Sequence, residues 1–164
     1  MKQSKLRTLV FSAAVAALVA VATLFLHVPI PMEAGYCNLG DGVILASGAL
    51  LGPWAAAAAA LGSALADLLL GYMAYAPVTA VIKGAMGLMA GTLCLRAKKA
   101  WLRIGWMALA EILMVGGYFL FECALYGAGA AAGSLPGNLF QSAAGLLVGA
   151  ALWPLIQRTT RLLK

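Results

Sequence analysis

The chain has 164 residues, of which 64% are hydrophobic, and eleven Lys or Arg face only five Asp or Glu. Soluble domains average roughly 45–50% apolar residues, so this composition excludes a water-soluble fold and predicts one membrane domain over residues 1–164. The formal net charge of +6 does not indicate a nucleic-acid surface, because the basic residues gather at the two ends and near residue 100.

Six apolar segments follow one another along the chain and predict an all-α bundle of six transmembrane helices. A spanning helix needs about 20 residues, and the second segment is short enough that a re-entrant loop is the alternative. The first segment resembles a secretory signal, with Ala20-Val21-Ala22 as a possible cleavage site, but it is longer than a usual signal core. The predicted spans are 8–26, 39–51, 54–70, 77–95, 101–126 and 137–156.

Charge parity favours six spans over five. Cytoplasmic loops are enriched in Lys and Arg, and six spans place all three basic groups, around residues 2–7, 96–103 and 158–164, on the same side. Both termini are therefore expected in the cytoplasm. The segments 27–38, 71–76 and 127–136 then face outward, and we expect the last, a Gly/Ala run, to be a flexible loop.

Five acidic or lysine residues lie at membrane depth in the predicted spans, and such a residue costs at least about 2.5–3.5 kcal/mol at a helix centre. Asp41, Asp67, Lys83 and Glu122 fall in the outer half of the membrane, whereas Glu111 lies deeper. Buried charges usually find partners, so one interpretation is that Lys83 pairs with Asp67 or Glu122 for neutralisation alone. The excess of acids over bases favours a ligand site instead.

Helical spacing adds polar groups to this cluster. Glu111, Tyr118 and Glu122 share one face of the fifth span, Asn138 and Gln141 share one face of the sixth, and Asn38 and Ser63 lie one turn from Asp41 and Asp67. Tyr72, Tyr75 and Tyr118 are the aromatic residues nearest to the acids. They are candidates for stacking on a flat heterocycle, the alternative being an interfacial aromatic belt.

Small residues dominate the first span, where Ala13, Ala16, Ala17 and Ala20 form overlapping small-xxx-small pairs. Such a surface lets helices approach closely, either within the bundle or against a membrane partner. The chain has no Walker motif, HExxH or Gly-x-Ser-x-Gly, and its three cysteines and lone histidine lack metal-ligand spacing. We therefore expect no catalysis, cofactor or metal, and an external energy source.

The sequence resembles the S components of energy-coupling-factor (ECF) vitamin transporters, in the branch of riboflavin, hydroxymethylpyrimidine and vitamin B6 uptake. The resemblance spans the chain, and its specific motifs lie between residues 36 and 91: YCNLGD (36–41), GSALADLLLGY (62–72), YAP (75–77) and IKGAMG (82–87). It implies a non-enzymatic, multi-pass protein of a prokaryotic plasma membrane that captures a vitamin from outside. It also implies two kinds of partner, a transmembrane T component, which would dock on the Ala-rich face of the first helix, and two cytoplasmic ATPases.

We expect the ligand to be a small heteroaromatic with donors or positive charge, since acids outnumber bases in the cluster. Hydroxymethylpyrimidine or a B6 vitamer fits better than an anionic folate, and riboflavin stays open. Two other classes remain alternatives, a non-transporting membrane scaffold and a membrane enzyme. The expected substrate-binding residues are Asn38, Asp41, Asp67, Tyr72, Tyr75, Lys83, Tyr118, Glu122, Asn138 and Gln141.

Overall fold

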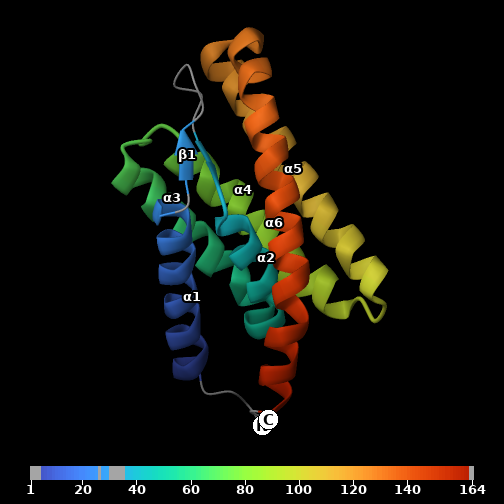
Figure 1. The fold of residues 1–164 in the computed structure, drawn as a ribbon. Coiled ribbons are helices and arrows are strands. Elements are labelled where there is room, and N and C mark those ends of the chain that lie inside the picture. The colour runs from blue at the N-terminus through green and yellow to red at the C-terminus, as the bar shows by residue number, and fades with distance from the viewer. Residues whose placement is uncertain (1–4, 26, 30–35, 163–164) are drawn as a thin grey trace.

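The computed structural model describes residues 5–25, 27–29 and 36–162, without the side chains of Val28, Pro29, Tyr36, Cys37, Arg161 and Leu162. The predicted all-helical class is confirmed (Figure 1). The long helices are α1 (Lys5–Phe25), α2 (Gly40–Leu51), α3 (Ala55–Leu70), α4 (Ala76–Met89), α5 (Ala100–Tyr126) and α6 (Ala128–Leu162). Two three-residue strands, β1 (His27–Pro29) and β2 (Tyr36–Asn38), form an antiparallel pair between α1 and α2, which the sequence did not predict.

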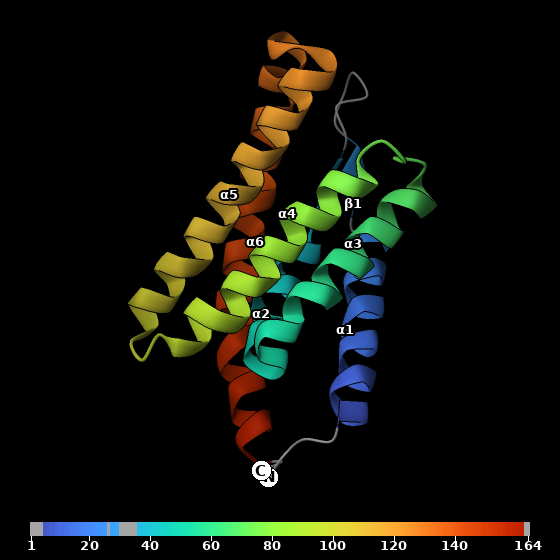
Figure 2. The same cartoon turned by 180° about the vertical axis from the view of Figure 1, so that it is seen from behind.

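Five segments of the described chain are long and apolar enough to cross a membrane, and one of them, Gly40–Leu70, contains both α2 and α3. Between these two helices the chain turns through the short 3₁₀ helix η2 (Gly52–Trp54), where Gly52 has a φ of 56°. Figure 2 shows α3 running back up from this turn. Since the backbone reverses here, α2 and α3 lie in the bundle as two separate helices.

The turn depends on a close backbone approach. The α4 helix continues into the single π-helical turn η3 (Ala90–Cys94), and Gly91 packs directly against the carbonyl of Gly52. A side chain at position 91 would overlap that carbonyl. The glycine pair thus fixes how α4 meets the α2–α3 turn.

The prediction of a flexible loop at 127–136 is wrong, because α6 begins at Ala128 instead of near residue 137. Four of the six residues from 128 to 133 are Ala, the best helix former, and they outweigh Gly129, Gly133 and Pro136. Together with the end of α5, this first part of α6 rises above the other helices (Figure 1). The segment predicted as a flexible loop at this end of the molecule is therefore helical.

The interior changes character along the bundle. An apolar core includes Ile44, Leu45, Met86, Met107 and Trp153, all fully buried. Toward the end where α2 starts and α3 ends, buried polar and charged side chains replace these residues. This polar layer contains the candidate site.

Candidate functional site

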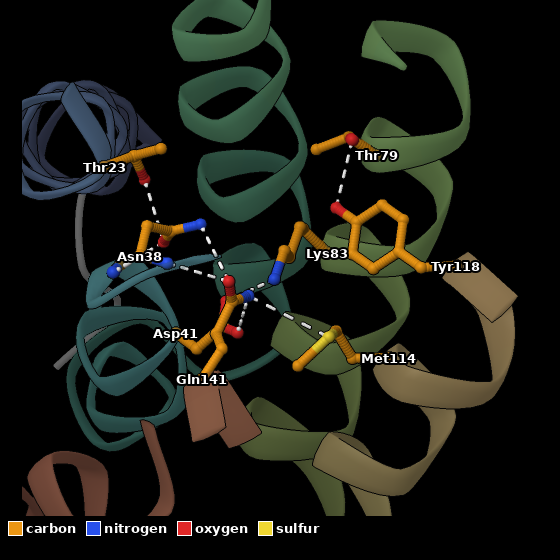
Figure 3. Close-up of polar contacts among 9 residues, drawn as sticks. Thr23, Asn38, Asp41, Thr79, Lys83, Met114, Tyr118 and Gln141 are labelled. Atoms are coloured by element: carbon orange, nitrogen blue, oxygen red, sulfur yellow. Dashed lines mark hydrogen bonds and ion pairs between the residues drawn. The ribbon is translucent and has the colours of Figure 1, made fainter. Parts of the chain in front are cut away.

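A continuous hydrogen-bonded network joins α2, α4 and α6 around Asp41, the second residue of α2 (Figure 3). Lys83 Nζ donates to Asp41 Oδ1 at 2.5 Å, and Gln141 Nε2 donates to Asp41 Oδ2 at 2.7 Å. Gln141 Oε1 in turn accepts a hydrogen bond of 2.8 Å from the backbone nitrogen of Asn38. Both oxygens of this buried carboxylate are therefore occupied, which fixes its position.

The partner of Lys83 differs from the two that the sequence suggested. The alternative interpretation of the cluster paired Lys83 with Asp67 or Glu122, but the ion pair forms with Asp41, and both side chains are almost fully buried. Loop 71–76 brings the chain back so that α4 packs beside α2, and Lys83 therefore faces the first turn of α2. Its ammonium also lies 5.4 Å from the ring centre of Tyr118, within cation–π distance.

A cavity lies above this network and collects most of the predicted residues. Asn38, Asp67, Tyr75, Lys83, Tyr118, Glu122, Asn138 and Gln141 line it, together with Thr23, Ser63 and Thr79. Asp41 lies just beneath the lining and holds Lys83 and Gln141 in place. Tyr72 does not line the cavity and instead packs edge-on against Tyr75, with ring centres 6.0 Å apart.

The cavity is narrow. The space that the centre of a water molecule can occupy is about 20 Å³, which is room for about one water molecule. A vitamin-sized ligand needs roughly 300 Å³ or more. Lining side chains must therefore move before a heterocycle can enter.

Glu122, a lining residue on α5, connects this helix to the start of α4 and to α6. It accepts hydrogen bonds from the Tyr75 hydroxyl at 3.4 Å and from the Ser134 hydroxyl. Burial raises the pKa of Tyr75, which lies between the spans, above its usual range, and nearby Glu122 adds to the effect. The Tyr75 hydroxyl therefore stays protonated and serves as a donor.

The cavity also offers a buried amide donor. Asn138 is 4% exposed, and its Nδ2 has no hydrogen-bond partner within residues 5–25, 27–29 and 36–162. Tyr118, in contrast, is held by a 3.0 Å hydrogen bond to Thr79. A ligand here would meet an amide, an ammonium, carboxylates and two tyrosine rings, whose centres lie 6.4 Å apart.

Sequence reasoning left Thr23, Ser63 and Thr79 out of the binding set. Ser63 and Thr79 each lie one helical turn before a charged lining residue, Asp67 and Lys83. This i, i+4 spacing placed Ser63 in the predicted polar cluster, and the same signal could have identified Thr79. Thr23 carried no such signal, because its place in the site depends on the β2 strand, where its hydroxyl donates to Asn38 Oδ1 at 3.5 Å.

The four alanines predicted for docking divide into two pairs. Ala13 and Ala17 are exposed, whereas Ala16 is half-buried with its carbonyl against Gly62 of α3, and Ala20 is only 5% exposed. The second pair thus contributes to packing within the bundle. A partner could reach only the first.

In the described part of the chain, no group of three or more His, Cys, Asp or Glu side chains could hold a metal ion.

The chain is similar in sequence to known proteins. The family model described as "ECF-type riboflavin transporter, S component" matches residues 3–158. A protein of Pyrococcus woesei named only as uncharacterised is 33% identical over 141 residues, 85% of this chain and 95% of its own length. A protein of Lactococcus lactis subsp. cremoris named "Thiamine precursor transporter HmpT" is 35% identical over 95 residues, 58% of this chain and 53% of its own length.

Proposed function

Because the chain belongs to the ECF-type riboflavin transporter S component family, a family of transporter subunits and not of enzymes, we propose that it captures hydroxymethylpyrimidine. The named function of the Lactococcus relative supports a thiamine precursor as the ligand. Riboflavin and B6 vitamers are the competitors that the experiment below includes.

The observation that carries the proposal is the mixed polarity of the cavity. Hydroxymethylpyrimidine presents an exocyclic amine and a hydroxyl as donors, and ring nitrogens as acceptors. Asp67 and Glu122 provide carboxylate oxygens for the donors, while Asn138 Nδ2 provides N–H groups for the acceptors. Tyr75 and Tyr118 supply aromatic surface for a flat ring.

The binding end faces the outside of the membrane in this proposal. The basic residues Lys5, Arg103 and Arg158 lie toward the opposite end of the helices, the end expected in the cytoplasm. The reversal at η2 supports counting α2 and α3 as two passes, which gives six passes and cytoplasmic termini. The membrane is then the plasma membrane of a prokaryote, and the cavity lies on the side from which the nutrient comes.

Transport needs partners in this scheme. We propose a transmembrane T component that docks on the exposed face of α1 containing Ala13 and Ala17, and two cytoplasmic ATPases that supply energy. A run of small residues on an exposed helix face supports close helix approach.

Equilibrium binding tests the function directly. The purified protein is titrated in detergent with hydroxymethylpyrimidine, riboflavin and pyridoxine, and its folding is checked by thermal unfolding. We expect saturable 1:1 binding with the highest affinity for hydroxymethylpyrimidine. A folded protein that binds none of the three contradicts vitamin capture, and tighter binding of riboflavin or pyridoxine contradicts the choice of ligand.

A further inference from the structure

Glu111 on α5 is buried to 99% by its neighbours, yet neither of its carboxylate oxygens has a hydrogen-bond partner in the described part of the chain. Burying a polar group without a partner is costly. Such a group in a native structure calls for an explanation. Glu111 does not line the cavity, so ligand contact does not supply one.

The surroundings of Glu111 connect it to the ion pair beneath the cavity. A Cβ atom at position 145 of α6 would lie 3.3 Å from Glu111 Cδ and 2.8 Å from Asp41 Cβ, so both acids border the gap beside Gly145. Glu111 also interacts electrostatically with Asp41 and Lys83. Two carboxylates thus lie near one ammonium.

Because the cavity is narrow, at least one lining side chain must move before a ligand can enter. Asp41 is held through both oxygens, Tyr118 is held by Thr79, and Tyr75 contacts Glu122. Lys83 has a long, flexible side chain, and a single hydrogen bond, to Asp41, holds its ammonium within the described residues. It can therefore make room in the cavity at little cost if a second carboxylate receives its ammonium.

We propose that Glu111 is the second counter-ion of Lys83, which receives the ammonium when a ligand enters the cavity. The lysine moves deeper into the bundle, the cavity gains volume, and the buried positive charge keeps a carboxylate partner throughout. Glu111 is accordingly a positioning residue that acts through Lys83 and does not touch the ligand. This inference rests on the proposed function, since it needs a ligand that occupies the cavity.

The first arm of the test measures the dissociation constant for hydroxymethylpyrimidine. Glu111→Gln keeps the size of the side chain and removes the carboxyl group that would receive the ammonium, so we expect about ten- to hundredfold weaker binding, the effect of losing one hydrogen bond to a charged group. Met107→Leu, a volume-conserving change one turn away on the same helix, is the matched control and should stay within about twofold of the unmodified protein. Wild-type affinity in Glu111→Gln overturns the proposal.

The second arm uses a readout that a purely structural role would not change. Infrared difference spectra, recorded with and without hydroxymethylpyrimidine, should contain a carboxyl band that disappears in Glu111→Gln, because the environment of Glu111 changes when Lys83 arrives. A spectrum without a Glu111-dependent band overturns the proposal even where affinity falls. Absence of any binding by the unmodified protein instead contradicts the proposed function itself.

Discussion

At the residue scale, the site contains two kinds of polar side chain. Some have all their hydrogen bonds satisfied by neighbouring residues, and others have a donor that no described residue satisfies. Asp41 and Gln141 bond to each other and to neighbours on two further segments, α4 and β2. Asn138 faces the cavity with its amide nitrogen unused by the described residues. The first kind fixes the shape of the site, and the second is the kind that a ligand can complete.

Asn138 is therefore predicted to bind a ring nitrogen of the ligand. Asn138→Leu should weaken hydroxymethylpyrimidine binding about ten- to hundredfold, because a hydrogen bond inside a buried site is lost and its partner is left unpaired. The measurement is titration calorimetry with hydroxymethylpyrimidine and with an analogue of it that has CH in place of one ring nitrogen. The unmodified protein should discriminate against the analogue, and Asn138→Leu should not. Equal discrimination by both proteins would remove Asn138 from this role.

Much of the residue list could be predicted because helical spacing determines which side chains share a face. Glu111, Tyr118 and Glu122 are all buried on α5, as their spacing indicates. The partner of Lys83 could not be predicted, since pairing depends on which helices are neighbours and not on position within one helix. Three carboxylates lay at a similar predicted depth, and only the packing of α4 beside α2 selects Asp41.

At the element scale, the turn between α2 and α3 depends on the Gly91–Gly52 contact. Gly91→Ala should destabilise the protein by about 1–3 kcal/mol, since an added methyl group in a filled space forces the backbone to shift. Gly116→Ala on α5 is the matched control, because no atom lies within 4 Å of the added carbon. The control should be neutral or stabilising by up to about 1 kcal/mol from helix propensity. Thermal unfolding in detergent measures both, and an equally stable Gly91→Ala protein would refute this role of the contact.

The exposed face of α1 gives a prediction that separates binding from transport. Ala13→Leu and Ala17→Leu place bulk on a surface away from the cavity, so vitamin binding should be unchanged while cellular uptake falls at least about tenfold. Val81→Leu, at a 72% exposed position on α4, is the control and should preserve both. Radiolabelled uptake in cells and binding by purified protein are compared. Normal uptake in the α1 variants would contradict docking through this face.

Element boundaries were less predictable than the elements themselves. The Gly, Pro and Ser residues between 127 and 137 are typical of a loop in water, but the structure continues α6 through them. In a membrane protein, neighbouring helices can satisfy the backbone groups that such residues free. The β1–β2 pair escaped prediction because three-residue strands are too short to show an alternating pattern.

At the scale of the whole molecule, the fold class could be predicted from the composition and from the placement of the charges. Hydrophobicity alone separates this chain from soluble proteins, and the family model covers nearly all of it. The number of passes stays a prediction, because five apolar segments meet the length requirement and the Gly40–Leu70 segment contains two helices.

Thiol labelling in intact cells tests the orientation. In a background without the native cysteines, Met73→Cys between α3 and α4 should react with a membrane-impermeant reagent, since residue 73 is 69% exposed and its loop faces outward in the proposed topology. Lys98→Cys, which is exposed between η3 and α5, should react only after the cells are opened. Labelling of position 98 in intact cells would mean that the basic loop faces outward, against the proposed topology.

The central claim is that the polar cavity lined by residues of α1, α3, α4, α5 and α6 holds the vitamin. An experimental structure with bound hydroxymethylpyrimidine tests this claim most directly. We expect the pyrimidine ring to lie between Tyr75 and Tyr118, within hydrogen-bonding distance of Asn138 and Asp67. We also expect Lys83 to have shifted away from Asp41. A ligand bound elsewhere, with the Lys83–Asp41 pair and the surrounding cavity unchanged, would contradict the claim.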